Sequence, residues 1–97
     1  MFARVTHVQA KPDMLQDVVA LYQDCVTPLL KQQQGFESTL LLTDPLTGKG
    51  MSITVWDSEA SRQAADGNGF LREQIMKVMP MLAAPPVPEG YVASGLN

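Results

Sequence analysis

Residues 35–58 of this 97-residue chain read GFESTLLLTDPLTGKGMSITVWDS, and this stretch decides the fold. Apolar and polar side chains alternate along residues 36–43 and again along residues 51–56, which is the two-residue period of half-buried strands. Between the two runs, Asp44 is suited to accept hydrogen bonds from nearby amides, and Gly48 tolerates a left-handed backbone. The stretch therefore predicts a β-hairpin.

Strict alternation divides the side chains of the hairpin between two faces. A strand over residues 1–10 alternates in the same way, with Ala3, Val5 and His7 opposite Arg4 and Thr6. Neither of its faces is purely apolar. One face of the sheet is therefore expected to pack against helices, and the other face against a partly polar surface. In the hairpin, the expected sets are Phe36, Ser38, Leu40 and Leu42 on one face of the first strand, and Met51, Ile53 and Val55 opposite Ser52, Thr54 and Trp56 in the second.

A helix is predicted before the hairpin, over residues 14–34, from apolar residues at three- and four-residue spacing. Asp13 is the expected N-cap of this helix. Proline removes a backbone amide inside a helix, so a kink or a restart is expected at Thr27 and Pro28. Gly35 is expected to end the helix in a left-handed conformation.

A second helical segment follows the hairpin. Ser58 is its expected N-cap, and residues 67–69 break it into two pieces. Residues 83–90 are rich in proline and predict an irregular connector, followed by a short last strand at 91–94. The order β-α-β-β-α-β predicts a ferredoxin-like α+β fold in a single domain, 1–97, with a four-stranded antiparallel sheet and its helices on one face.

The composition excludes several classes of function. A net charge of −3 disfavours nucleic acid and acidic membrane surfaces, which attract basic proteins. The single cysteine, Cys25, excludes an internal disulfide and a cysteine-based zinc site. The sequence has no apolar run of the length that a signal peptide or a membrane span needs. A cytoplasmic protein without a bound metal is therefore expected.

Short motifs at turns and caps carry a family resemblance. They are Lys11-Pro12, Pro28-Leu29-Leu30 with Gly35-Phe36, Leu41-Leu42-Thr43-Asp44, Thr47-Gly48-Lys49 and Val55-Trp56-Asp57-Ser58. Together with the element order, these motifs resemble the antibiotic biosynthesis monooxygenase family of dimeric α/β barrels. The resemblance implies a homodimer in which two sheets pack face to face, with a cavity on the sheet face away from the helices. Some members of this family oxidise phenols or quinols without a cofactor, because the reduced substrate itself activates oxygen.

Another branch of the family degrades haem. This branch is characterised by an asparagine on the first strand, and by a tryptophan and a histidine on the second helix. The corresponding positions of this chain hold Val5, Ala65 and Ile75, and its one histidine, His7, lies on the first strand. We therefore expect no haem and no other cofactor.

Six side chains are candidates for a cofactor-free oxidation, which needs an apolar pocket, a base and a group that stabilises an anion. Histidines titrate near neutral pH, so His7 is the candidate base, and Arg4 is the candidate partner of a phenolate. Each also has a structural interpretation: His7 as a half-exposed strand residue and Arg4 as the partner of a carboxylate across a dimer. The candidate substrate-binding residues are Trp56, Thr54, Ser52 and Tyr91, of which Trp56 is also a candidate core or dimer anchor.

Two functions follow from the sequence, and they stay open at this point. One is a cofactor-independent monooxygenase that oxidises a small aromatic quinol or phenol in the cavity of a dimeric barrel. The other is a non-catalytic barrel that binds a small apolar or aromatic molecule or is associated with stress. Both faces of the first strand are candidates for the cavity wall.

Overall fold

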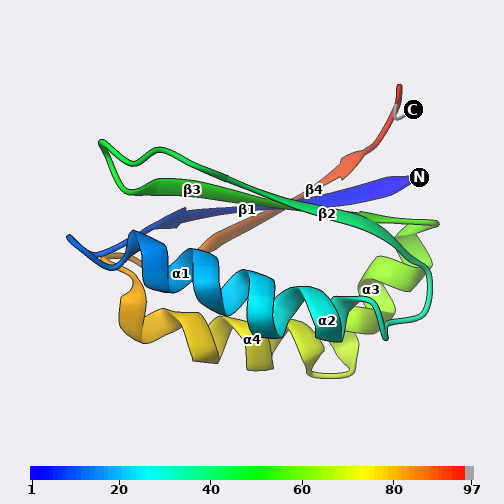
Figure 1. Cartoon of the computed structure of the whole chain (residues 1–97). Helices are drawn as coiled ribbons and strands as arrows, with labels where there is room; N and C mark the ends of the chain where they lie inside the picture. Colours follow the sequence, from blue (N-terminus) through cyan, green and yellow to red (C-terminus); the bar gives the residue numbers. More distant parts are fainter. Residues whose placement is uncertain (96–97) are drawn as a thin grey trace.

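A computed structural model gives the fold of this chain and describes residues 1–95. Four strands form one layer, and the helices pack beneath it on a single face (Figure 1). The elements in chain order are β1 (Phe2–Gln9), α1 (Leu15–Leu21), a π-helical turn (Tyr22–Val26), α2 (Thr27–Leu30), β2 (Phe36–Thr43), β3 (Lys49–Trp56), α3 (Glu59–Gly67), α4 (Phe70–Val78), a 3-10 turn (Met79–Met81) and β4 (Val87–Val92).

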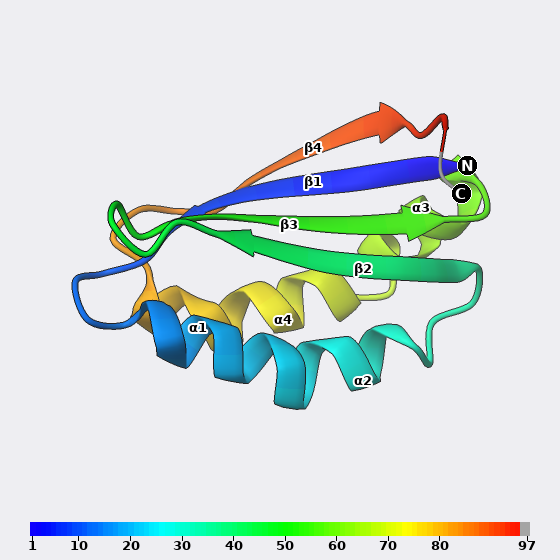
Figure 2. The same ribbon diagram turned by 45° about the horizontal axis from the view of Figure 1, so that its top comes forward.

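The strands form an antiparallel sheet in the order β2-β3-β1-β4 (Figure 2). β1 is central, so that Phe2 lies opposite Trp56 on β3 and opposite Val92 on β4. This arrangement, with helices on one face, confirms the ferredoxin-like α+β fold that the sequence predicts.

The hairpin of β2 and β3 is confirmed, and so is the chemistry of its turn. Asp44 accepts a hydrogen bond of 2.9 Å from the amide of Leu46 through its side chain. Gly48 has a φ of +76° and donates its amide to the backbone oxygen of Asp44. Gly35 has the predicted left-handed conformation, at φ +81°. The helical segment already ends at Leu30, however, so the expectation that it continues to residue 34 and ends at Gly35 was wrong.

A β-bulge in β2 changes which side chains face the helices. Phe36 pairs with Trp56 while Ser38 pairs with Val55, so Glu37 is an extra residue in the strand. Phe36 therefore leaves the face that strict alternation gave it, and its ring packs edge-on against Trp56 at a centroid distance of 5.7 Å. The expectation that Phe36 shares a face with Ser38 was wrong because the bulge shifts the two-residue period by one.

Another expected feature of the first helical segment was wrong. Asp13 has a φ of +66°, a conformation that aspartate tolerates, and the helix is preceded by Met14 without a side-chain cap. The expected restart is confirmed, because α2 begins at Thr27 with Pro28 in its first turn. Thr27 donates its amide to Tyr22 five residues earlier, which makes the π-helical turn between α1 and α2.

The second helical segment begins as predicted, but the last strand does not. Ser58 Oγ accepts a hydrogen bond of 3.2 Å from the amide of Ser61, and Gly69 at φ +86° separates α3 from α4. β4 starts at Val87 and includes Pro88, so the predicted connector over 83–90 was wrong from residue 87 onward. β4 pairs with β1 alone and is an edge strand, where a proline is tolerated.

Two apolar clusters lie between the sheet and the helices. One is formed by Leu30, Trp56, Ala65 and Phe70, and the other by Ala10, Val18 and Leu82. Both clusters bury side chains of the helices against the same face of the sheet. The space between them is the site described next.

Candidate functional site

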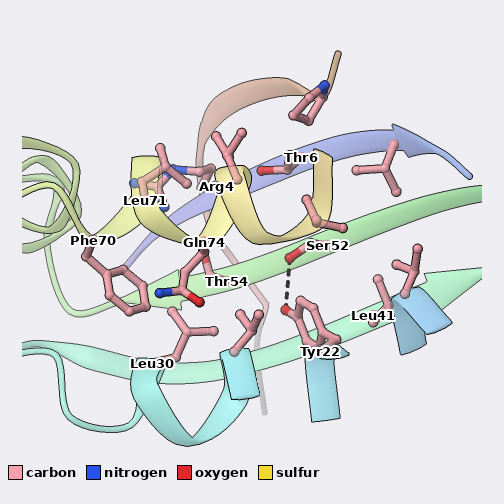
Figure 3. A pocket seen from close by; sticks show the side chains of 16 residues that line it. Arg4, Thr6, Tyr22, Leu30, Leu41, Ser52, Thr54, Phe70, Leu71 and Gln74 are labelled. Atoms are coloured by element: carbon pink, nitrogen blue, oxygen red, sulfur yellow. Dashed lines mark hydrogen bonds between the residues drawn. The ribbon is translucent and has the colours of Figure 1, made fainter. Parts of the chain in front are cut away.

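A cavity of about 90 Å³ lies between the sheet and the helices (Figure 3). Apolar side chains form most of its walls, including Val18, Leu30 and Phe70 from the two core clusters. Six polar side chains also line it: Arg4, Thr6, Tyr22, Ser52, Thr54 and Gln74. An apolar enclosure with a few polar groups is the usual form of a small-molecule site.

The strands supply the polar side of this cavity. Ser52 on β3 lies opposite Thr6 on β1, and Thr54 lies opposite Arg4, so all four side chains point to the helices. The alternate residues of β3, such as Ile53, point to the other face of the sheet. The polar set of β3 therefore faces the protein interior.

Three hydroxyl groups form a chain at one end of the cavity. The Tyr22 hydroxyl lies 2.8 Å from Ser52 Oγ and also hydrogen-bonds Thr39 Oγ1. Thr39 donates its own hydroxyl hydrogen to the backbone oxygen of Ile53 at 3.2 Å. Because each hydroxyl has one hydrogen, Thr39 accepts from Tyr22, and Tyr22 accepts from Ser52. Tyr22 begins the π-helical turn, a feature that is frequent at functional sites.

Gln74 places an amide group in the cavity wall. Its side chain is directed from α4 toward the sheet (Figure 3), and the residue is only 7% exposed. Gln74 Oε1 accepts from Lys77 Nζ at 3.5 Å, whereas Nε2 has no hydrogen-bond partner among the described residues. A buried donor without a partner costs about 1–3 kcal/mol, so this nitrogen is a strong candidate contact for a ligand.

Arg4 carries the positive charge at the cavity. Its guanidinium forms an ion pair with Asp66 on α3 and donates to the backbone oxygen of Arg62 at 3.3 Å. Burial, and secondly the charge of Arg62, lower the pKa of Arg4 from its usual range to about 10, so it stays protonated at neutral pH. The carboxylate that pairs with Arg4 thus lies in the same chain.

Trp56 is a core residue behind the cavity wall. It is fully buried in the cluster with Leu30 and Phe70. The guanidinium carbon of Arg4, Cζ, lies 6.0 Å from the centroid of the Trp56 ring. The indole Nε1 donates to Thr54 Oγ1 at 3.1 Å. Trp56 therefore orients the Thr54 hydroxyl, and the structure supports its interpretation as a core anchor.

His7 and Tyr91 lie on the opposite face of the sheet. His7 pairs across the strands with Met51 and Val87, and its Nε2 is 2.5 Å from Glu89 Oε1 on the solvent-exposed side. The Tyr91 hydroxyl donates a hydrogen bond to the Glu89 carboxylate, and this bond, together with the charge of Glu89, raises the pKa of Tyr91. The sheet thus separates His7 and Tyr91 from the cavity of their own chain.

Three of the six candidate residues, Arg4, Ser52 and Thr54, meet at the cavity. The sequence reasoning missed Tyr22 and Gln74. Tyr22 lies at the apolar spacing of the helix predicted over residues 14–34, and the signal that identifies it is its hydroxyl, which needs a partner when it is buried. Gln74 occupies a stripe position three residues after Leu71 and four before Val78, and a polar residue at such a position is the signal that identifies it.

Within residues 1–95, no helix combines the length and the apolar character that crossing a bilayer requires. Over the same residues, no three histidine, cysteine or acidic side chains gather where they could hold a metal ion.

The sequence profile of the antibiotic biosynthesis monooxygenase family matches residues 1–73. The chain belongs to this family. A search of curated proteins found no match.

Solved structures with the same fold come from several bacteria. A Deinococcus radiodurans protein, provisionally described as an antibiotic biosynthesis monooxygenase, has a TM-score of 0.79 at 13% identity, covering 100% of this chain and 96% of its own. The Streptomyces coelicolor monooxygenase ActVA-Orf6, solved with the ligand Nanaomycin D, has a TM-score of 0.76 at 21% identity, covering 99% and 89%. Rv0793 of Mycobacterium tuberculosis has a TM-score of 0.76 at 17% identity, covering 98% and 96%. At these identities the likeness shows the shared fold.

Proposed function

We propose that this protein is a cofactor-independent monooxygenase that oxidises a small aromatic quinol or phenol. The site is the cavity between its sheet and its helices, and not the barrel cavity on the other face of the sheet that was expected from the sequence. The observation that carries the proposal is a buried, charged arginine, Arg4, beside an apolar cavity. Membership of the monooxygenase family supports the reaction class. The Nanaomycin D complex of the Streptomyces coelicolor protein supports an organic ligand for this fold.

The proposed reaction balances without a cofactor. A phenol and one dioxygen molecule give a quinone and one water molecule. One oxygen atom forms a bond to a ring carbon, and the other leaves as water with the two hydrogens that the phenol loses. The substrate supplies all four electrons, so no other reductant is needed. The step begins from the phenolate, whose negative charge the Arg4 guanidinium stabilises in a poorly hydrated site.

The cavity favours substrates that ionise readily. Among the described residues, no histidine and no carboxylate lines it, so the protein stabilises a phenolate there without supplying a strong base. The pKa of about 10 keeps Arg4 charged near neutral pH, and the Asp66 carboxylate is shared between Arg4 and Arg62. Phenols with electron-withdrawing substituents are therefore the preferred substrates.

A ligand must widen the cavity when it binds. A volume of about 90 Å³ is smaller than the cavity of about 150 Å³ that holds one benzene ring in another protein. The half-buried side chains of Leu71 and Ile75, both on α4, line the cavity and have room to move toward solvent. We expect ligand binding to displace this part of α4.

Oxygen uptake with a panel of quinols and acidic phenols tests the proposal. The Arg4→Met variant is expected to lose about 100-fold in rate, because the anion loses its cationic partner. Arg72→Met, which removes an exposed arginine from α4, serves as the matched control and is expected to match the unmodified protein. Uptake no faster than a protein-free blank for every substrate would refute the monooxygenase.

The absence of a base from the described cavity wall favours one alternative, a protein that binds an aromatic molecule without converting it. This alternative predicts that ligands raise the thermal unfolding temperature while oxygen uptake stays at the blank. The same two measurements therefore separate catalysis from binding.

The open face of the sheet supports a homodimer. Its exposed apolar residues include Leu40, Leu42 and Val87, each about half exposed in a single chain. We infer that the sheet of a second copy of this chain covers them, as the family resemblance implies for a dimeric α/β barrel. Burial of these residues would add apolar stabilisation that one chain does not obtain.

A further inference from the structure

Two of the polar groups at the cavity, Ser52 and Gln74, offer a ligand hydrogen-bonding capacity of opposite kinds. The first is Ser52 Oγ. Its hydrogen is used toward Tyr22, because the Tyr22 hydrogen goes to Thr39 and the Thr39 hydrogen goes to the backbone oxygen of Ile53. Ser52 therefore presents lone pairs to the cavity, where it acts as an acceptor.

The second group is the amide nitrogen of Gln74, which acts as a donor. Lys77 donates to Gln74 Oε1 at 3.5 Å, and a lysine ammonium has no lone pair, so this contact orients the oxygen toward Lys77. The nitrogen is left without a partner among the described residues, in a side chain that is more than nine-tenths buried. A ligand that accepts a hydrogen bond would satisfy it.

We propose that Ser52 and Gln74 select a ligand with two groups: an aromatic hydroxyl that donates to Ser52 and a carbonyl oxygen that accepts from Gln74. Tyr22 is the positioning residue, since its hydrogen bond keeps the Ser52 hydroxyl in the accepting direction. The inference deepens the proposed function by naming its substrate class, hydroxyaryl ketones and hydroxylated quinones. It also agrees with the absence of a base from the described cavity wall, because a conjugated carbonyl makes a phenol more acidic.

Binding of three matched ligands tests the inference. The probes are para-hydroxyacetophenone, which has both groups, para-methoxyacetophenone, which lacks the donor, and para-ethylphenol, which lacks the carbonyl. Calorimetric titration of the unmodified protein is expected to show the hydroxy ketone bound about tenfold more tightly than either of the others, the value of one hydrogen bond. Equal affinity for the three ligands, or binding of none, would overturn the inference.

Variants assign each preference to its residue. Gln74→Leu is expected to bind para-ethylphenol and the hydroxy ketone equally, because the amide donor is gone. Tyr22→Phe frees the Ser52 hydroxyl to donate. The variant is therefore expected to bind the hydroxy ketone and the methoxy ketone with about equal affinity. Gln63→Leu removes an exposed glutamine from α3 and is expected to keep both preferences. Affinity ratios are the readout because a general loss of packing weakens all three ligands together.

The binding test is independent of turnover. Selective binding without oxygen uptake would preserve this inference and refute the monooxygenase. Oxygen uptake by a protein that does not distinguish the three ligands would do the reverse.

Discussion

The two faces of the sheet use their side chains in opposite ways. The face toward the helices carries Arg4, Ser52 and Thr54 around a partly open cavity. The face away from the helices carries the apolar residues Ile53 and Leu40, which lie opposite each other on neighbouring strands. An antiparallel sheet with one solvated face usually turns its apolar residues to the helices and its polar residues to water.

This inversion indicates two different environments in one small domain. Polar side chains are useful inside because they line a cavity and most of them have partners, as in the hydroxyl chain of Ser52, Tyr22 and Thr39. Apolar side chains on the other face have no covering element among residues 1–95 (Figure 1). The difference between the faces is explained if the inner one binds a ligand and the outer one binds a second copy.

The largest expected effect is on the helix face, at Trp56. Its ring is fully buried and contacts Phe36 as well as the core cluster. Trp56→Ala leaves a large cavity and is expected to lower the free energy of unfolding by about 3–5 kcal/mol. Urea unfolding followed by circular dichroism measures this. A loss below about 1 kcal/mol would mean that this face is not the packed one.

The next effect is expected on the open face, at Ile53. A charge in the middle of an apolar interface has no partner there, so Ile53→Arg is expected to convert a dimer into a monomer. Light scattering at micromolar concentration measures the mass. Gln63→Arg places the same charge on the exposed surface of α3 and is expected to leave the mass unchanged. A monomeric mass for the unmodified protein would contradict the assembly.

Most of the fold could be predicted because local chemistry determines it. The turn at Asp44 and Gly48 and the cap at Ser58 depend on contacts between residues no more than four apart in sequence, and all are confirmed. The wrong predictions concern segments whose structure depends on a residue that is distant in sequence. Pro88 lies in a strand only because β1 pairs with it at an edge. The extra residue Glu37 is placed by packing of its neighbour against the core.

The site was less accessible to sequence reasoning. Alternation separates Ser52 and Thr54 from Ile53 on β3, but it does not say which set meets the helices. Judged by polarity alone, the apolar set belongs inside, and the structure shows the reverse. Tyr22 and Gln74 come from two different helices, and only the tertiary packing brings them to one cavity. The residue pattern within one helix does not indicate which side chains of another helix line the same cavity.

The smallest expected effect is a contrast in alkaline pH dependence between the two faces. Folding lowers the pKa of Arg4 from its usual range to about 10, so as the pH passes through this value the unfolded chain holds more protons at this site. Through Arg4, the free energy of unfolding therefore rises with pH around this value. The pKa of Tyr91 is raised above 10.0 by Glu89, so there the folded chain holds more protons and the contribution falls with pH.

Denaturant unfolding from about pH 9 to about pH 11, compared between variants, separates the two signs. The free energy of unfolding of the unmodified protein, minus that of Arg4→Met, is expected to increase with pH because the variant lacks the rising contribution. The free energy of unfolding of the unmodified protein, minus that of Tyr91→Phe, is expected to decrease with pH. Two slopes of the same sign would contradict the placement of one group in a buried ion pair and the other beside an exposed carboxylate. Opposite slopes would assign the two groups to electrostatically different faces of one sheet.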